Sequence, residues 1–364
     1  VSGGSATIGG SGTSTVTLTG TVAQINATLA ATVNYVPTAN YNGTATLTMT
    51  TSDNGNTGGG GPLNDVDTVT INITAVNDAP TLTATAVNPT FAEGAGSTQA
   101  GAVSVFSGAA VGTVETGQTI TGLSFTVGGL LDGANERIVV DGSTITLGAN
   151  SSGTTATNGM SYTVTIAGGT ATVVLSSVAG VSTANINSLV NGITYQNTSI
   201  DNPTDGNRVF TLTQVVDSGG TANGGVNTTT LSIASTVDVN PADDAPINTV
   251  PAAQTTNEDT SKAITGLSIS DVDAGSGSMT VTLGVTNGTL TVSGGSATIS
   301  GSGTGTVTMT GTVAQINATL AATVNYVPTA NYNGMATLTM TTSDNGNTGS
   351  GGPLNDVDTV TINI

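Results

Sequence analysis

The chain has 364 residues, enough for two or three domains, and a formal net charge of -19 from 22 acidic and only 3 basic residues. Such a surface excludes binding to nucleic acid or to an acidic membrane, because attraction to phosphate groups requires Lys and Arg. The lack of cysteine and histidine excludes disulfides, thiolate zinc sites and catalysis by Ser-His or Cys-His pairs, and no apolar run is long enough to span a bilayer.

An internal repeat determines the expected organisation. Residues 1–73 return as residues 292–364, so that residue n of the first copy corresponds to residue n + 291 of the second. We therefore expect three β-domains: the C-terminal part of a repeat at 1–80, a larger, diverged repeat with longer loops at 81–246, and a complete repeat at 247–364. The same logic predicts that about 45 residues equivalent to 247–291 precede Val1 in the native chain. The two copies differ only at Gly9/Ser300, Ser14/Gly305, Leu18/Met309, Thr44/Met335 and Gly59/Ser350.

Strands are predicted wherever Thr alternates with Val, Ile, Leu or Met. This pattern covers 68–73 in the first copy, and 118–125, 210–217 and 230–234 in the diverged repeat, where 186–195 matches the stretch 316–326. In the complete repeat it covers 264–269, 279–283, 289–292, 306–309, 324–327 and 336–340, while residues 313–320 have the spacing of a short helical turn. About seven short strands separated by turns predict an antiparallel β-sandwich.

Two short acidic segments punctuate these domains. One is Val76-Asn77-Asp78-Ala79-Pro80, and the other runs from Val237 to Asp243-Asp244-Ala245-Pro246. Proline cannot continue a central strand, and it biases the residue before it toward an extended conformation. Each segment is therefore predicted to be a stiff hinge between two β-domains.

The acidic residues can be assigned to the ends of the predicted sandwiches. Asp271 and Asp273 end the second strand of the complete repeat and face its hinge, as do Asp344 and the pair Asp356 and Asp358. One junction is expected to collect Glu93, Asp201 or Asp205, Asp243, Asp244, Asp271 and Asp273. Calcium prefers six to eight oxygen ligands, several of them carboxylates, and almost no Lys or Arg is available to neutralise this cluster. By contrast, Asp53, Asp141 and Asp217 are expected to be solvated turn residues.

These motifs resemble a known family. Glu258, Asp271-Val272-Asp273 and the Asn77-Asp78-Ala79-Pro80 linker resemble the interdomain calcium motifs of cadherins. With Asn257-Glu258-Asp259-Thr260, they are similar to the cadherin-like tandem repeats of giant bacterial adhesins, including the repeats-in-toxin type. The resemblance implies tandem Ig-like sandwiches arranged end to end, secretion to the cell surface, and a calcium-stiffened stalk for attachment, cell-cell adhesion or biofilm. The expected calcium ligands are Asp65, Asp67, Asp78, Glu93, Asp201, Asp205, Asp243, Asp244, Glu258, Asp259, Asp271, Asp273, Asp356 and Asp358.

Other functional classes fit the sequence less well or are not distinguished by it. A carboxylate pair for glycoside hydrolysis is formally possible, but nothing predicts the aromatic cleft that accompanies one, so no enzyme is expected. A carbohydrate- or receptor-binding module is an alternative, although near-identical tandem copies favour a spacer. The sequence does not separate a stalk from a self-assembling surface filament or sheath. The expected partners are calcium, neighbouring repeats, and either other copies of the chain or surface glycans.

Overall fold

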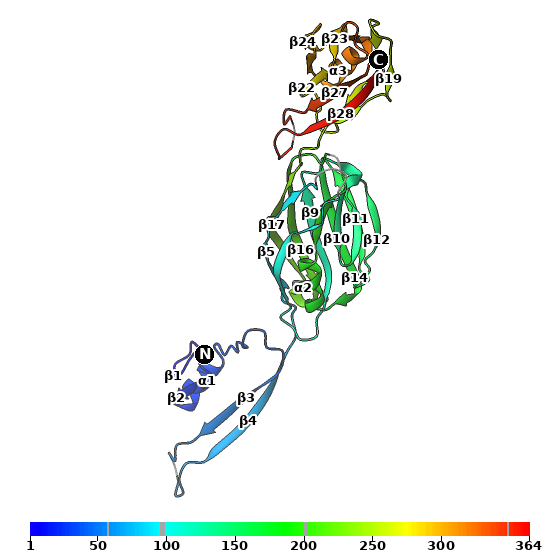
Figure 1. Ribbon diagram of the computed structural model, residues 1–364. Coiled ribbons are helices and arrows are strands. Elements are labelled where there is room, and N and C mark those ends of the chain that lie inside the picture. Colours follow the sequence, from blue (N-terminus) through cyan, green and yellow to red (C-terminus); the bar gives the residue numbers. More distant parts are fainter. Residues whose placement is uncertain (57, 95–98, 200–201, 348) are drawn as a thin grey trace. The chain divides into compact units, whose positions relative to one another are not determined.

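The computed structural model describes residues 1–56, 58–94, 99–199, 202–347 and 349–364 (Figure 1). The chain is an all-β protein built from antiparallel sandwich domains in tandem, with three short α-helices in the described ranges. None of the helices in these ranges is long and apolar enough to cross a membrane. The chain divides into two compact units, one formed by Val1–Asp78 with Gly220–Val226, the other by Ala79–Gly219 with Asn227–Ile364.

The first unit contains two small antiparallel sheets and a helix. Strand β1 (Thr7–Gly9) pairs with β2 (Thr17–Thr19), and β3 (Gly43–Ser52) forms a long hairpin with β4 (Asn64–Ile73) (Figure 1). The helix α1 (Val22–Leu29) begins after Thr21, whose hydroxyl accepts the Gln24 amide while the Gln24 side chain accepts the Thr21 amide. This capping box satisfies amides that a helix start otherwise leaves without partners. The unit also holds a short 3-10 turn at Ala222–Gly224.

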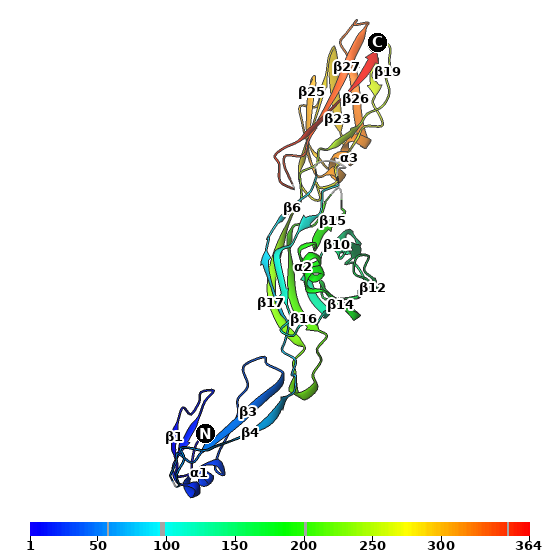
Figure 2. The ribbon, with the colours of Figure 1, turned by 90° about the horizontal axis from the view of Figure 1, so that it is seen from below.

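The middle sandwich, which lies in the second unit, consists of a seven-stranded sheet opposite a four-stranded sheet. The larger has the order β12-β13-β14-β9-β16-β17-β6, the smaller β11-β10-β15-β7, and β5 pairs separately with β8. The layers can be followed in Figure 2, where β10 and β15 lie across from β16 and β17. The elements are β5 (Thr81–Ala86), β6 (Thr90–Ala92), β7 (Val103–Ser104), β8 (Phe106–Gly112), β9 (Ile120–Gly128), the 3-10 turn Gly133–Asn135, β10 (Glu136–Val140), β11 (Ser143–Thr146), β12 (Ser151–Thr154), β13 (Ser161–Ala167), β14 (Thr170–Val181), α2 (Thr183–Asn191), β15 (Thr194–Asn197), β16 (Gly206–Asp217) and β17 (Thr228–Asn240).

Two expectations for this sandwich are corrected. The additional length relative to the complete repeat forms regular strands, β10 to β13, rather than longer loops. Strand β17 also continues past the predicted 230–234 to Asn240, because Val237 and Val239 are buried in the core and pair with β16. The acidic hinge is therefore shorter than expected and begins at Pro241.

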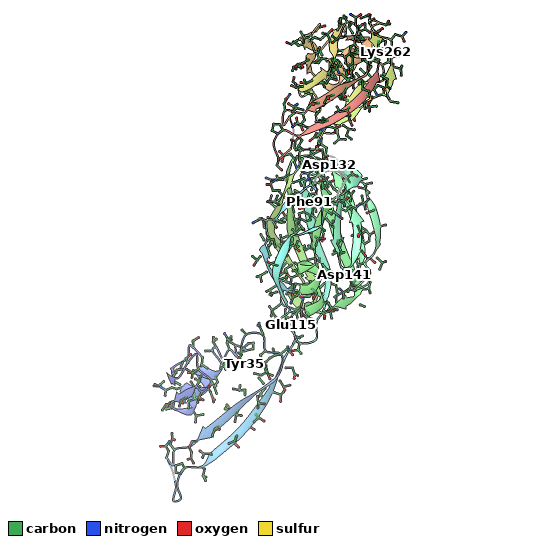
Figure 3. The ribbon with its side chains drawn as sticks, in the orientation of Figure 1. Tyr35, Phe91, Glu115, Asp132, Asp141 and Lys262 are labelled. Carbon is green, nitrogen blue, oxygen red and sulfur yellow. The ribbon has the colours of Figure 1, made fainter. Side chains whose placement is uncertain are left out.

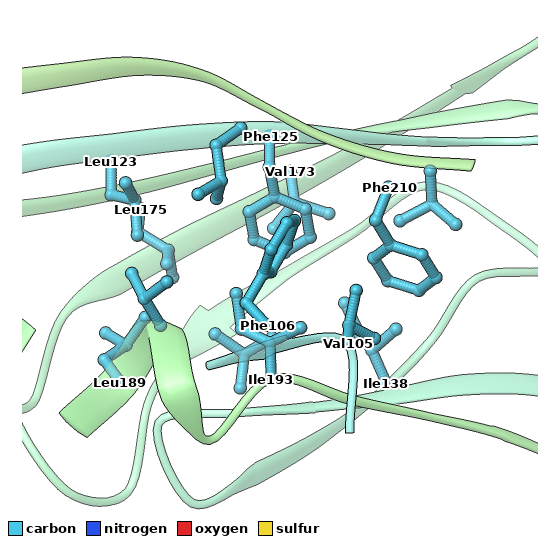
Figure 4. Close-up of a cluster of buried hydrophobic side chains, with 14 of the residues drawn as sticks. Val105, Phe106, Leu123, Phe125, Ile138, Val173, Leu175, Leu189, Ile193 and Phe210 are labelled. Atoms are coloured by element: carbon cyan, nitrogen blue, oxygen red, sulfur yellow. The ribbon is translucent and has the colours of Figure 1, made fainter. Parts of the chain in front are cut away.

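Aromatic side chains centre the core of the middle sandwich. Figure 4 shows Phe106, Phe125 and Phe210 among aliphatic neighbours such as Val173. The Tyr195 ring packs edge-on against Phe210, with ring centroids 6.1 Å apart, an arrangement that aromatic pairs prefer. Both sheets contribute to this single cluster of buried side chains.

The C-terminal sandwich has its own core and closes the complete repeat. A six-stranded sheet with the order β19-β28-β27-β22-β25-β24 faces a three-stranded sheet, β20-β26-β23, while β18 pairs with β21. The helix α3 (Val313–Ala322) has the same capping box as α1, made by Thr312 and Gln315. The strands are β18 (Ile247–Thr249), β19 (Gln254–Thr255), β20 (Lys262–Ala263), β21 (Ser268–Ser270), β22 (Met279–Val285), β23 (Gly288–Ser293), β24 (Thr298–Ser300), β25 (Thr306–Gly311), β26 (Thr323–Pro328), β27 (Met335–Ser343) and β28 (Asn355–Asn363).

Several strands differ from their prediction. The predicted strand 264–269 is broken, because Gly266 adopts φ +85, in the left-handed region, so that only β20 and β21 are regular. The pairs β19–β28 and β6–β17 are parallel rather than antiparallel. Residues 33–37, which correspond to most of β26, form no strand in the first unit. In the complete copy β26 pairs with β20 and β23. Residues 1–80 include no counterpart of β20, and of β23 they include only the counterparts of its last two residues.

Candidate functional site

The acidic linker, residues 241–246, connects β17 to β18 and lies along the loop between β27 and β28. Pro241 has no amide to donate, but its carbonyl accepts a hydrogen bond from Ser350 N at 3.0 Å, and Asp243 N donates to Ser350 O at 3.4 Å. Ala242 and Ser350 form a parallel bridge. These contacts hold the linker backbone against the loop of the C-terminal sandwich.

A tight turn after β21 brings two further carboxylates to the linker. The Asp271 Oδ1 atom accepts hydrogen bonds from the amides of Asp273 (3.2 Å) and Ala274 (3.0 Å), the pattern of an Asx turn. Asp273 is buried, and its Oδ2 atom accepts a hydrogen bond from Asp244 N at 3.0 Å. The turn and the linker are thus joined through acidic residues.

Asp344 is the residue of this site that the expected ligand set lacks. It follows β27 and is buried, and its Oδ1 atom accepts hydrogen bonds from the amides of Gly346 (2.8 Å) and Leu354 (2.9 Å). Its charge acts directly on Asp243. The sequence placed Asp344 at the correct end of the sandwich, but gave no sign that the loop after it folds back onto the linker.

Asp243 has the least satisfied side chain of the site. It is only 5% exposed, and neither carboxylate oxygen accepts a hydrogen bond of normal geometry. Its pKa is raised, first by burial and then by the negative charges of Asp344, Asp273 and Asp244, although the nearby Gly352 amide opposes the shift. A buried acceptor without a donor is costly, so this side chain lies where a cation would be favourable.

The Asp271 carboxyl shows the same crowding. Burial, together with a hydrogen bond to Asp273 and the charge of Asp273, raises the pKa of Asp271 to about 7. Two neighbouring carboxylates repel each other, so holding both ionised is unfavourable. The second oxygen of Asp271, Oδ2, is buried and has no hydrogen-bond partner.

No basic side chain neutralises this cluster within the described ranges, where both recorded ion pairs belong to Arg208 of the middle sandwich. In the same ranges, no three acidic side chains converge as a ready-made metal-binding group. Both oxygens of Asp243 and one oxygen of Asp271 are nevertheless buried without hydrogen-bond partners, and carboxylate oxygens are the ligands that hard cations prefer.

The middle sandwich contributes one of its three expected ligands to the linker. Glu93 is buried after β6, and its Oε2 atom accepts a hydrogen bond from Ala242 N at 3.0 Å. Asp205 is exposed just before β16. Asp201 lies outside the described residues.

Of the remaining expected ligands, Asp356 and Asp358 lie toward the hinge end of the C-terminal sandwich, as expected, because β28 begins beside the end of β27 and Asp356 pairs with Thr342. Asp356 accepts a hydrogen bond from Asn248 N at 2.7 Å, and Asp358 is half-buried on β28. Glu258 and Asp259 follow β19, which pairs with the far end of β28, so they lie at the opposite end of the sandwich, as expected. Asp65 and Asp67 are exposed on β4.

The first linker, before Pro80, has an amide where the second has a carboxylate. Asn77 occupies the position of Asp243, and its Nδ2 atom donates to the carbonyls of Gly220 (3.2 Å) and Val226 (2.8 Å) within the first unit. A carboxylate cannot donate in this way. The Asn77 side chain therefore has hydrogen-bond partners within the first unit, whereas the Asp243 carboxylate accepts from no donor. The neighbouring Asp78 is the one expected calcium ligand at this linker.

The middle sandwich has no counterpart of Asp271-Val272-Asp273 after its second strand, and the acids nearest to that place, Asp132 and Glu136, have a structural role. Arg208, fully buried, contacts Glu136 Oε1 through Nε at 2.5 Å and Asp132 Oδ2 through Nη2 at 3.0 Å. Tyr195 donates to the same Glu136 oxygen at 3.0 Å, and burial followed by the charge of Glu136 raises the pKa of Tyr195. Figure 3 shows Asp132 and Glu115 toward opposite ends of this sandwich. The carboxylates of Asp132 and Glu136 thus pair with Arg208 inside the sandwich.

The three expected turn acids behave differently from one another. Asp53 is exposed, and the amides of Gly55 and Leu63 lower its pKa, as expected for a turn residue. Asp141 and Asp217 are buried rather than solvated. Asp141 adopts φ 50 and accepts hydrogen bonds from Thr155 Oγ1 and Asn158 Nδ2, both at 2.5 Å, so it closes a loop from inside.

Comparison with known proteins gives only distant similarity. No family model and no curated protein matches the chain. Among solved structures, a mouse cadherin-23 fragment (EC22-24) is similar at 14% identity and a TM-score of 0.27, over 87% of this chain and 73% of that one. Mouse protocadherin-24 EC1-3 is similar at 16% identity and a TM-score of 0.27, over 88% and 79%. The protocadherin gammaB4 extracellular domain has 16% identity and a TM-score of 0.27, and this chain spans 44% of its length.

Proposed function

We propose that the chain is a segment of an extracellular adhesive stalk whose sandwich repeats are stiffened by calcium at the acidic linker. The observation that carries the proposal is the Asp243 carboxylate, which is buried without a hydrogen-bond donor beside Asp244, Asp273 and Asp344. Of the cations available outside cells, calcium is the one whose preferred ligands are clustered carboxylate and carbonyl oxygens.

Each group near the linker has a defined part in this proposal. Asp243 and Asp271 provide the unpartnered oxygens, while Asp273 is anchored by the Asp244 amide and Asp344 by the amides of its own loop. A bound cation would supply positive charge and tie the linker to the turn at 271–274. The orientation of the C-terminal sandwich relative to the linker would then be fixed by ligation rather than by apolar contact.

Extracellular calcium modules bind at ~10⁻⁴–10⁻³ M, so millimolar calcium would hold such a stalk stiff. Surface display, and attachment to surface glycans or to other copies of the chain, are parts of the same proposal. The acidic composition supports them only indirectly, because it excludes nucleic acid and acidic lipid as partners.

Calorimetric titration of calcium into the purified chain tests the proposal. The parent chain should bind calcium, and Asp344→Asn should weaken binding about ten-fold or more, since it removes a charge from the cluster. Asp53→Asn is the matched control, because Asp53 makes the same two loop hydrogen bonds in the first copy without an acidic cluster around it. Equal heats for parent and Asp344→Asn would show that these acids bind no calcium.

Small-angle scattering tests the mechanical part. In chelator, the maximum dimension of the chain should decrease and its distribution of interatomic distances should broaden. The double variant Asp243→Asn, Asp271→Asn should show the same change in the presence of calcium. Scattering profiles that coincide in calcium and in chelator would show that calcium does not stiffen the linker.

A further inference from the structure

The loop between β27 and β28 covers the buried carboxylate of the acidic linker with a single layer of backbone. Residues 349–352 of this loop are all exposed, and Ser350 is the only one of the four that has a side chain. A Cβ atom on Gly351 would lie 3.1 Å from Asp243 Cβ and 3.8 Å from Asp243 Oδ2. The thin cover explains why Asp243 is only 5% exposed and yet has few protein atoms around it at longer range. We call residues 349–352 the lid.

The lid rests on the linker without apolar packing. The Ser350 amide donates to the Pro241 carbonyl at 3.0 Å, and the Asp243 amide donates to the Ser350 carbonyl at 3.4 Å. The Ser350 hydroxyl also donates to the Pro241 carbonyl, at 3.3 Å. No side chain of the lid belongs to the core of the C-terminal sandwich, so opening the lid breaks only these few bonds. Segments attached in this way open at a small cost in free energy while the rest of the domain stays folded.

The base of the same loop is fixed, which confines movement to the lid. The Asp344 carboxylate accepts hydrogen bonds from the Gly346 and Leu354 amides, and the Asp344 amide donates to the Leu354 carbonyl at 3.3 Å. These bonds join the two ends of the loop where it leaves the sheet. A loop that is anchored at its base and weakly attached at its tip can swing as a unit.

The first linker has a similar contact that is held more firmly. Within the first unit, residues 220–226 lie against Asn77, and the Val226 amide donates to the Asn77 carbonyl at 2.9 Å. The Asn77 side chain also donates to the carbonyls of Gly220 and Val226, so it ties both sides of that loop. A carboxylate cannot donate, so Asp243 cannot tie its lid in this way.

We propose that the lid opens to let a cation reach or leave the Asp243 carboxylate and then closes over it. With the lid shut, the carboxylate has almost no contact with solvent, so a hydrated ion has to displace the lid to reach it. Closure depends on Gly349, which adopts φ +87 and where a Cβ atom would lie 2.3 Å from the Ala242 carbonyl carbon. The exchange of a cation rests on the proposed function, whereas the opening of the lid does not.

Thiol labelling tests the lid without calcium, since the chain contains no cysteine. In Asp243→Cys the thiol lies beneath the lid, so a neutral thiol reagent should modify it at least about ten-fold more slowly than the exposed thiol of Glu258→Cys. Adding Gly349→Ala to Asp243→Cys should raise its rate at least about five-fold, because the added methyl group cannot fit against the linker.

Gly303→Ala is the matched control for backbone strain in these labelling experiments. Gly303 lies in the same sandwich and has φ +90, but no atom lies within 4 Å of the position of its Cβ, so this change should leave the labelling rate of Asp243→Cys unaltered. Equal effects of Gly349→Ala and Gly303→Ala would overturn the proposal. The same holds if Asp243→Cys reacts as fast as Glu258→Cys.

Hydrogen exchange of the unsubstituted chain shows whether the lid moves by itself. In chelator, the Ser350 amide should exchange at least about one hundred-fold faster than the slowest amides of β27, because opening the lid leaves the sandwich folded. Exchange of Ser350 only at the rate of global unfolding would make the loop a fixed wall of the site, and the proposal would be wrong. Gly349→Ala should speed this exchange without lowering Tm more than Gly303→Ala does, since the lid adds nothing to the core.

The rate of calcium release measures the effect of the lid on the bound ion. When the calcium-loaded chain is mixed with excess fluorescent chelator, Gly349→Ala should release calcium at least about five-fold faster than the parent, and Gly303→Ala should match the parent. Equal release from Gly349→Ala and the parent, with calcium bound to both, would show that the lid does not control exchange. A chain that binds no calcium would overturn the proposed function and the exchange of a cation with it, while thiol labelling would still decide whether the lid opens.

Discussion

Replacing Asp243 by Asn should change the stability of the acidic linker in opposite directions with and without calcium. Without metal, the Asp243 carboxylate is buried beside three other acids and neither oxygen accepts a hydrogen bond. Asn has nearly the same shape, removes the charge and adds two donors. The chain already uses Asn at the corresponding position of the first linker, where Asn77 donates to two carbonyl groups.

The size of the effect follows from burial and mass action. An unpartnered buried polar group costs about 1–3 kcal/mol. Asp243 is covered but has few protein atoms around it at longer range, so its cost lies at the low end of that range. In chelator we therefore expect Asn at this position to stabilise the linker by about 1 kcal/mol. At a calcium concentration one hundred times Kd, the parent gains about 2.7 kcal/mol. A ten-fold loss of affinity in the variant would halve that gain to about 1.4 kcal/mol.

Hydrogen exchange at the Asp244 amide provides a local measure of linker opening, because this amide donates to Asp273 Oδ2 at 3.0 Å. In chelator the amide should exchange about five-fold more slowly in Asp243→Asn than in the parent. In calcium the parent should gain at least about ten-fold more protection than the variant, and Asp53→Asn should behave as the parent in both conditions. Faster exchange of the variant in chelator, or an equal calcium response, would refute the reasoning.

Three further predictions concern pH and the two cores. In chelator, the free energy of unfolding should fall as pH rises from about 4 to about 7, because folded Asp271 keeps its proton up to a pKa of about 7 whereas an unfolded Asp loses it near 3.9. Urea titrations at several pH values measure this slope, and Asp271→Asn should flatten it. A free energy of unfolding that rises over the same interval would contradict the prediction. Leu338→Ala should cost about 2–5 kcal/mol by chemical denaturation, and Leu47→Ala under about 1 kcal/mol, since only Leu338 is buried; equal costs would contradict the difference in burial. Arg208→Ala should destabilise the middle sandwich by about 3–5 kcal/mol by leaving Glu136 buried without its ion pair, and adding Glu136→Gln should recover part of the loss; thermal melts that show no recovery would mean that packing rather than charge dominates.

Local sequence patterns predicted those elements whose partners are close or whose two faces differ strongly. Alternation of Thr with apolar residues located β22, β25 and β27, and the helical spacing at 313–320 corresponds to α3. The prediction for 264–269 was wrong because Gly266 takes a positive φ, which its neighbours do not reveal. The end of β17 was missed because pairing with β16, far away in sequence, extends it to Asn240.

The sequence predicted at which end of the sandwich the candidate site lies, but not which of its side chains contact one another. The sequence placed Asp243, Asp244, Asp271 and Asp273 at one junction, and these residues do lie together there. It did not predict the part played by Asp344, because that depends on how a glycine-rich loop returns to the linker. It also did not predict that the Asx turn would occupy one Asp271 oxygen and leave the other without a partner.

The capping boxes at Thr21 and Thr312 bear on the order in which a repeat folds. Helix α1 has the same cap as α3, and the hairpin β3–β4 has the register of β27–β28. In the complete copy, α3 and the hairpin β27–β28 rest on contacts between residues close in sequence, whereas β22 pairs with β25 and with β27, which follow it only after intervening elements. Local contacts cost less loop-closure entropy than distant ones, so we expect the helix and the hairpin to form before β22 is paired, and that pairing to limit the folding rate of the repeat.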